Sequence, residues 1–134
     1  MCGIFAYIGC DGTSDDVRTL AIRAASLQKH RGPDWDGSYA FPKGVLVHSR
    51  LAIMAPSSGS QPLTSLCGKV RVCVNGEIYN YTEVIYRCMN AGYDAPKTGS
   101  DCEAIVLAYM RWGMNFPAYL DGIFAAVVVD ERDP

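Results

Sequence analysis

The second residue of the chain is a cysteine that directly follows the initiator methionine. The sequence begins Met1-Cys2-Gly3, so removal of Met1 would leave a first residue that carries both a thiol and a free α-amino group. A thiol titrates at about 8.5 and an α-amine at about 7.7–8.0, so near neutral pH the amine can accept the thiol proton. An amine of this kind is a known base for an activated nucleophile. Cys2 is therefore a candidate catalytic nucleophile, although its position alone is also compatible with chance.

A thiolate that attacks an amide or an ester needs hydrogen-bond donors for the oxyanion that develops. Asn75-Gly76 offers two such donors, a side-chain amide and an unhindered backbone N–H. The same dipeptide between two apolar runs is also a strong signal for a type I′ hairpin turn. Judged from the local sequence, the turn is the favoured interpretation, and the oxyanion role is the alternative.

Three charged residues are candidates for binding a substrate. Arg50 follows a predicted strand, and a guanidinium group can bind a carboxylate through two parallel hydrogen bonds. Asp101 can hold an ammonium group. Each has an ordinary alternative: a surface arginine for Arg50, and for Asp101 an acid in the first turn of a helix, where it favours the helix dipole. Glu77 is equally ambiguous, and we interpret His30 as a structural residue because an amine base makes a histidine dispensable.

Composition restricts the class of protein. The chain has 134 residues, 49% hydrophobic and 19% charged, with a net charge of −2, which predicts a globular protein of one domain. No basic run indicates nucleic acid, and no apolar stretch reaches the roughly 18–20 residues that a membrane span needs. No signal peptide is recognisable, so we expect a cytoplasmic protein with free thiols. The spacing of Cys and His predicts no metal site, and no cofactor motif is present.

Hydrophobic periodicity and turn residues predict an ordered series of strands and helices. Ser14 is the expected N-cap of the first helix, and Ser100 with Glu103 forms a predicted capping box for the last one. Val70, Val72 and Val74 alternate along one face of a strand. The expected strands cover 3–8, 37–41, 45–49, 69–74 and 122–130, with a loop at 56–62, and the expected helices cover 15–29, from about 82 to 92, and from about 101 to 113.

Strands and helices are mixed without strict alternation, which favours an α+β layered fold over a doubly wound one. The strand Ile123–Val129 is so apolar that we expect neighbouring strands on both of its sides. No further strand follows it in the sequence.

Together these segments resemble the glutaminase domain of class II glutamine amidotransferases, the N-terminal-nucleophile family, and within it the asparagine synthetase type. The matching segments run in family order along essentially the whole chain. They are Met-Cys-Gly-Ile-Phe (1–5), His-Arg-Gly-Pro-Asp-Trp (30–35), Arg-Leu-Ala-Ile (50–53), Gln-Pro-Leu (61–63), Asn-Gly-Glu-Ile-Tyr-Asn (75–80), Thr-Gly-Ser-Asp-Cys-Glu (98–103) and Gly-Ile-Phe-Ala (122–125). As a series they are highly specific.

The resemblance implies the reaction and the nucleophile. Cys2, freed of Met1, would attack the side-chain amide of L-glutamine, and its own α-amine would move the proton. Asn75 and Gly76 would form the oxyanion hole, which shifts the interpretation of that dipeptide toward a functional one. Water would then release glutamate from the thioester. The resemblance implies no cofactor.

The resemblance also implies how glutamine would be held. Arg50 would bind its α-carboxylate, Glu77 and Asp101 would hold its α-ammonium group, and backbone groups near Ile53 would orient it. The implied fold is a four-layer αββα sandwich of antiparallel sheets. Ala6 stands where the family usually has glycine, a change that we expect to be tolerated.

The resemblance covers the amino-terminal part of the family's glutaminase domain, and we expect residues 1–134 to form one domain that is incomplete at its C-terminal end. The synthetase domain that binds ATP and aspartate and receives the ammonia is expected to be absent from this chain. Two other functions remain open at this stage. One is a catalytically silent glutamine-binding or regulatory module, or a fragment that needs a partner chain; the other is a hydrolase for a different amide.

Overall fold

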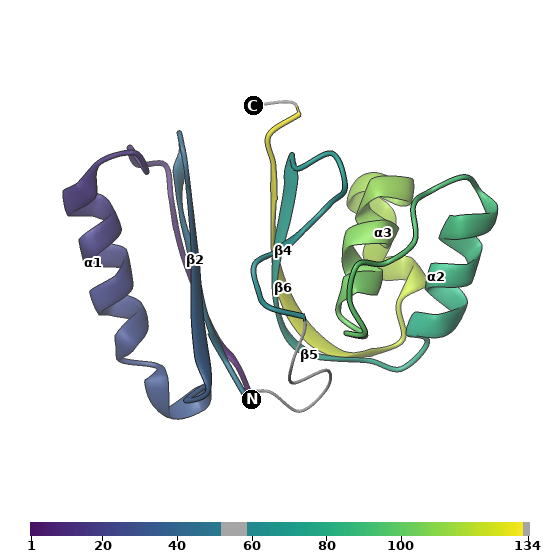
Figure 1. Ribbon diagram of the computed structural model, residues 1–134, viewed down its shortest axis with the longest axis horizontal. Helices are drawn as coiled ribbons and strands as arrows, with labels where there is room; N and C mark the ends of the chain where they lie inside the picture. Colours follow the sequence, from purple (N-terminus) through teal and green to yellow (C-terminus); the bar gives the residue numbers. More distant parts are fainter. Residues whose placement is uncertain (52–58, 133–134) are drawn as a thin grey trace.

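Two antiparallel sheets lie face to face at the centre of the protein, and helices cover both outer faces (Figure 1). The computed structural model describes residues 1–51 and 59–132. In Figure 1 the layers follow one another as α1, the sheet that contains β2, the sheet that contains β4, β5 and β6, and then α3 with α2. This is the four-layer αββα arrangement that the resemblance implied, and it confirms the predicted α+β class.

The first sheet is built around a strand that is buried along its whole length. Its order is β1-β3-β2, with β1 at Gly3–Ile8, β2 at Trp35–Phe41 and β3 at Gly44–Arg50. Because side chains alternate along a strand, Val45 and Val47 face outward, where they pack with Ala21 and Ala25 of helix α1 (Asp15–Ser26). Leu46 instead faces the second sheet.

The second sheet has the same number of strands and carries the larger core. Its order is β4-β5-β6, with β4 at Leu63–Thr64, β5 at Val70–Ile78 and β6 at Gly122–Asp130. The outer face is covered by α2 (Tyr81–Asn90) and α3 (Glu103–Trp112), and a 3₁₀ segment, η2 (Gly113–Tyr119), leads into β6. Val70, Val72 and Val74 face these helices as one buried row, as predicted.

Apolar side chains also fill the space between the two sheets. Phe41 and Leu46 of the first sheet pack with Cys73 and Val129 of the second. Apolar side chains therefore fill three spaces in the sandwich: one under α1, one under α2 and α3, and one between the two sheets. We call the space between the two sheets the middle layer. The functional residues described below lie at one end of the middle layer.

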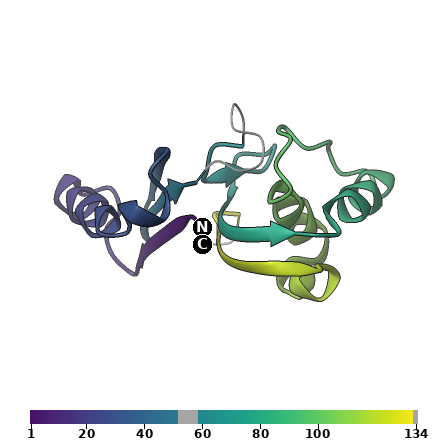
Figure 2. The same cartoon turned by 90° about the horizontal axis from the view of Figure 1, so that it is seen from below.

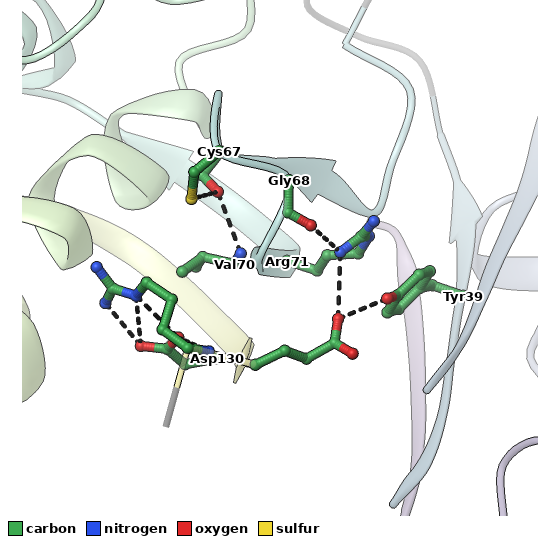
Figure 3. Close-up of polar contacts among 9 residues, drawn as sticks. Tyr39, Cys67, Gly68, Val70, Arg71 and Asp130 are labelled. Carbon is green, nitrogen blue, oxygen red and sulfur yellow. Dashed lines mark hydrogen bonds and ion pairs between the residues drawn. The ribbon is translucent and has the colours of Figure 1, made fainter. Parts of the chain in front are cut away.

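At the other end of the middle layer, a polar cluster links the sheets, and we call it the clamp (Tyr39, Arg71 and Glu131). The Tyr39 hydroxyl donates a hydrogen bond of 2.5 Å to the Glu131 carboxylate, and Arg71 lies 3.3 Å from the same oxygen (Figure 3). The Arg71 guanidinium also lies 3.6 Å from the centre of the Tyr39 ring and donates to the Gly68 carbonyl. The clamp thus ties β2 of the first sheet to the start of β5 and the end of β6 in the second sheet.

The prediction of a hairpin turn at Asn75-Gly76 was wrong. Both residues lie inside β5, opposite Ala125 and Phe124 of β6. Gly76 has a φ of +146°, and a Cβ atom there would lie 2.1 Å from the Ile123 carbonyl oxygen. The glycine is therefore required by the close approach of β6, a distant segment, rather than by a local turn.

Two helix ends also differ from the prediction. The first helix ends at Ser26 instead of 29, and residues Lys29–Arg31 form a separate 3₁₀ turn, η1. The last helix begins at Glu103, so the predicted capping box does not form: Glu103 instead accepts hydrogen bonds from the backbone N–H groups of Lys97 and Thr98. Ser14 does occupy the N-cap position of α1, but its side chain makes no capping hydrogen bond.

Strand β6 has one neighbour in the described residues. It pairs with β5 along its whole length and forms the edge of its sheet, as β1 does in the first sheet. Two strand neighbours were expected from its apolar sequence. Among the described helices, none is both long and apolar enough to cross a membrane.

Candidate active site

A pocket opens where the start of β1, the end of β3 and the middle of β5 meet. β1 and β3 are antiparallel, so the start of the first strand lies beside the end of the second, with Gly3 opposite Ser49. Figure 2 shows the N-terminus between the two sheets. The residues that line the pocket include Met1, Cys2, Arg50, Leu51, Asn75, Gly76, Glu77 and Asp101.

The Cys2 thiol is half-buried and fixed by the backbone of the neighbouring strand. The Leu51 N–H donates a hydrogen bond to its sulfur at 3.4 Å, and the Leu51 carbonyl lies 3.8 Å from the same atom. The Arg31 side chain donates to the Cys2 carbonyl at 3.2 Å. These contacts fix the thiol at the start of β1, where it lines the pocket.

Asn75 and Gly76 line the pocket from β5 of the second sheet. Alternation along β5 places the Asn75 side chain on the same face as Cys73, between the sheets and therefore toward the first sheet. Because β6 holds this part of β5 in a ladder, the two predicted oxyanion donors belong to a rigid strand. The hydrogen-bond donors of a catalytic site are most effective when they are fixed in this way.

Arg50 and Asp101 bring opposite charges into the same pocket. Arg50 is 7% exposed and Asp101 is 5% exposed. Asp101 accepts a hydrogen bond of 2.8 Å from the Ile78 N–H through one carboxylate oxygen. A Cβ atom on Gly59 would lie 3.4 Å from a terminal nitrogen of Arg50 and 3.0 Å from the Ser100 Cβ, so a larger residue at 59 would press on Ser100.

The loop that carries Asp101 is held by a buried carboxylate. Glu103, 5% exposed, accepts hydrogen bonds from the backbone N–H groups of Lys97 and Thr98 at 2.5 and 2.7 Å and from the Thr98 hydroxyl at 2.6 Å. The segment 97–103 therefore closes on itself at the start of α3. This closure fixes where Asp101 enters the pocket.

The structure brings six of the seven predicted site residues together in the pocket: Cys2, Arg50, Asn75, Gly76, Glu77 and Asp101. The seventh, Ile53, lies outside the described residues. Sequence reasoning assigned no role to the pocket residues Gln61 and Cys102, and it gave Ser100 only a helix-capping role. The only signal for Gln61 and Cys102 was their presence in two of the matching segments.

The sequence of the chain is similar to sequences of known proteins. A family model described as a glutamine amidotransferase domain matches residues 1–134. The chain is 44% identical over 133 residues to asparagine synthetase [glutamine-hydrolyzing] 1 of Arabidopsis thaliana and 43% identical to asparagine synthetase [glutamine-hydrolyzing] of Asparagus officinalis. The chain belongs to the glutamine amidotransferase domain family.

The similarity covers nearly all of this chain but a small part of those relatives. Each of the two alignments includes 99% of the chain and 22% of the relative. A solved structure of glutamine phosphoribosylpyrophosphate amidotransferase from B. subtilis superimposes with a TM-score of 0.68 over 97% of this chain and 35% of that one, at 19% identity. That likeness shows the N-terminal-nucleophile amidotransferase fold.

This glutamine amidotransferase domain has a second thiol in its pocket, and burial makes it unreactive. Burial, with a smaller contribution from Asp101, raises the pKa of Cys102 to about 12. Its thiol lies 3.7 Å from the Gly76 carbonyl, to which it donates. Cys102 therefore stays protonated near neutral pH, and a protonated thiol is a poor nucleophile. No group of three or more His, Cys, Asp or Glu that could hold a metal ion occurs among residues 1–51 and 59–132.

Proposed function

We propose that this chain hydrolyses L-glutamine to glutamate and ammonia through a thioester on Cys2. The observation that carries the proposal is the pocket itself: it combines one thiol fixed at a strand end, two candidate oxyanion donors and two buried, oppositely charged side chains. The names of the Arabidopsis and Asparagus relatives, which contain "glutamine-hydrolyzing", support the choice of glutamine.

Recognition of glutamine follows from the charges. Free glutamine carries an α-carboxylate and an α-ammonium group on one carbon. Arg50 would bind the carboxylate, and Asp101 with Glu77 would bind the ammonium group, which leaves the side-chain amide to point toward Cys2. Backbone groups near Ile53 would complete the orientation. A hydrolase for an amide without an α-amino acid group would gain nothing from this pair of buried charges.

The reaction proceeds in two balanced steps. The α-amine of Cys2, free after removal of Met1, takes the thiol proton, and the thiolate attacks the amide carbon while Asn75 and Gly76 donate to the oxyanion. The α-ammonium group then returns the proton to the amide nitrogen, the carbon–nitrogen bond breaks, and ammonia leaves while the acyl group remains on Cys2 as a thioester. A water molecule hydrolyses the thioester, which yields glutamate and restores the thiol.

The proposal extends to the context of the domain. Residues 1–134 form one domain that corresponds to the amino-terminal part of an asparagine-synthetase-type glutaminase, and they act in the cytoplasm. The ammonia passes to a synthetase domain or chain that binds ATP and aspartate. The relatives' names, which read asparagine synthetase, support the link to a synthetase.

The test is ammonia release from glutamine by the purified chain, with the intact mass recorded on the same sample. Protein without Met1 is expected to release ammonia, and Cys2→Ala is expected to abolish the release while the thermal unfolding midpoint stays unchanged. Cys67→Ala is the matched control, because that thiol is exposed and lies outside the pocket.

Two results would overturn the proposal. Ammonia release that survives in Cys2→Ala would show that another group does the chemistry. Glutamine binding without ammonia release, in protein that has lost Met1, would make the chain a silent binding module. Protein that keeps Met1 is expected to be inactive, because the amine is then part of a peptide bond.

A further inference from the structure

Strand β5 loses its strand neighbour on one side just before it reaches the pocket. β4 pairs only with Val72 and Arg71. From Val74 onward, the backbone groups on that side of β5 bind side chains in place of a strand. Val74 binds Gln61, the Gly76 carbonyl accepts from Cys102, and the Ile78 N–H donates to Asp101. The pocket opens along this row.

Gln61 imitates a paired strand at Val74. Its side-chain oxygen accepts the Val74 N–H at 2.6 Å, and its side-chain nitrogen donates to the Val74 carbonyl at 3.2 Å. Gln61 is 5% exposed, so neither bond competes with bulk water. Both backbone groups of Val74, the residue directly before Asn75, are therefore held by one side chain.

His48 holds the same carbonyl from the opposite sheet. It lies on β3, it is fully buried, and its Nε2 atom is 2.9 Å from the Val74 oxygen. A carbonyl can only accept, so Nε2 carries the hydrogen. The other ring nitrogen, Nδ1, is buried without a hydrogen-bond partner among the described residues. A buried nitrogen of this kind is unfavourable for folding, and native proteins seldom keep one without a reason.

We propose that Gln61 and His48 are positioning residues for the oxyanion hole: by fixing the Val74 backbone from two directions, they set where the Asn75 side chain and the Gly76 N–H point. The inference rests on the proposed glutaminase function. Neither residue touches the glutamine amide in this account. Their effect is transmitted through the backbone of one residue, Val74, and appears only when the oxyanion forms.

A positioning role predicts a particular kinetic signature. Displaced oxyanion donors lose interactions that exist only in the transition state, so kcat falls while KM for glutamine stays nearly constant. Removing an oxyanion donor outright costs about 10²–10³ in kcat. Displacing one is expected to cost less, about 10-fold for Gln61→Met and about 3-fold for His48→Leu.

The experiment measures kcat and KM for glutamine in Gln61→Met, His48→Leu and His48→Gln. The last variant keeps an N–H donor for the Val74 carbonyl and is expected to recover most of the wild-type kcat. Asn80→Leu is the matched control, since the Asn80 amide also binds two backbone groups, the Tyr119 carbonyl and the Asp121 N–H, outside the pocket. It is expected to lower stability and to leave kcat within about twofold.

A second measurement guards against variants that are merely unstable. Amide hydrogen exchange at Val74 and Gly76 is expected to accelerate in Gln61→Met and to stay at the wild-type rate in Asn80→Leu. Wild-type kcat in Gln61→Met, or a rise in KM with kcat unchanged, would overturn the inference while the glutaminase function stands. A wild-type chain that releases no ammonia would overturn the proposed function, and the inference with it.

Discussion

Both ends of the middle layer contain an arginine and a carboxylate, but one end is a hydrogen-bonded polar cluster and the other lines an open pocket. At one end the clamp joins Tyr39, Arg71 and Glu131, and each of these polar groups binds another. At the other end Arg50 and Asp101 are more deeply buried than Arg71 and Glu131, and they line an open pocket.

We therefore expect the clamp to stabilise the fold and the pocket to carry binding and catalysis. At the clamp, charge is placed against charge, and the side chains of Arg71 and Glu131 are 19% and 23% exposed. At the pocket, Arg50 lies at the end of β3 and Asp101 in the turn before α3, and both buried charged groups line the open space. A mutation at the clamp should therefore change unfolding, and the same mutation at the pocket should change binding or turnover.

The largest expected effect compares the two arginines. Arg50→Ala is expected to lower kcat/KM for glutamine by about 300-fold, mainly through KM, because loss of one partner of a buried charge pair costs about 2–5 kcal/mol. Arg71→Ala is expected to lower the free energy of unfolding by about 2 kcal/mol, through the lost ion pair and ring contact, and to leave KM unchanged. Steady-state kinetics and urea unfolding of both variants check this. An unchanged KM in Arg50→Ala would remove Arg50 from the site.

Two glycines with positive φ provide the next comparison. A Cβ at Gly76 would lie 2.1 Å from the Ile123 carbonyl, whereas a Cβ at Gly68, beside the clamp, would meet nothing within 4 Å. Gly76→Ala is expected to displace β6 and to lower kcat by about 100-fold. Gly68→Ala is expected to cost about 1 kcal/mol of stability, from backbone strain alone, with normal turnover. Equal effects of the two substitutions on kcat would contradict the assignment of Gly76.

The smallest expected effect is the pH dependence of stability that His48 causes. Burial, and to a lesser extent the charge of Arg50, lowers the pKa of folded His48. Below about pH 6.5, the ordinary histidine value, the unfolded chain therefore takes up a proton more readily than the folded protein. The contribution of His48 to stability is complete above that pH and is lost as the pH falls below it.

Urea unfolding between pH 7.5 and 5.5 measures this effect. The decline in stability is expected to flatten in His48→Gln and to persist in His30→Gln, because His30 is exposed. Parallel pH profiles for the wild type and His48→Gln would show that the folded protein tolerates a charged His48.

The elements with strong periodicity could be predicted from the sequence, and the exceptions share one cause. The alternating valines of β5 and the apolar run of β6 were found where the structure has them. The Asn75-Gly76 turn was wrong because pairing with β6, almost fifty residues later in the chain, overrides the local preference. The capping box at Ser100 failed similarly, since Glu103 binds the loop before it.

The site was predictable to the extent that it depends on residue type. A thiol, an amide and charged side chains stand in segments that resemble a known family, and six of them meet in one pocket. Gln61 and His48 could not be given a role in this way, because their contact with Val74 depends on which side of β5 lacks a strand. That is a property of the sheet and has no local signal in the sequence.

The most direct test of the account is the intact mass of the protein during turnover. Protein without Met1 is mixed with glutamine, quenched in acid within the first turnovers, and its mass is measured, with peptide mapping of any adduct. We expect a fraction of the chain to gain the mass of one glutamyl group, bound at Cys2 and removed by hydroxylamine. Ammonia release with no adduct at Cys2, or with an adduct at another cysteine, would contradict the central claim.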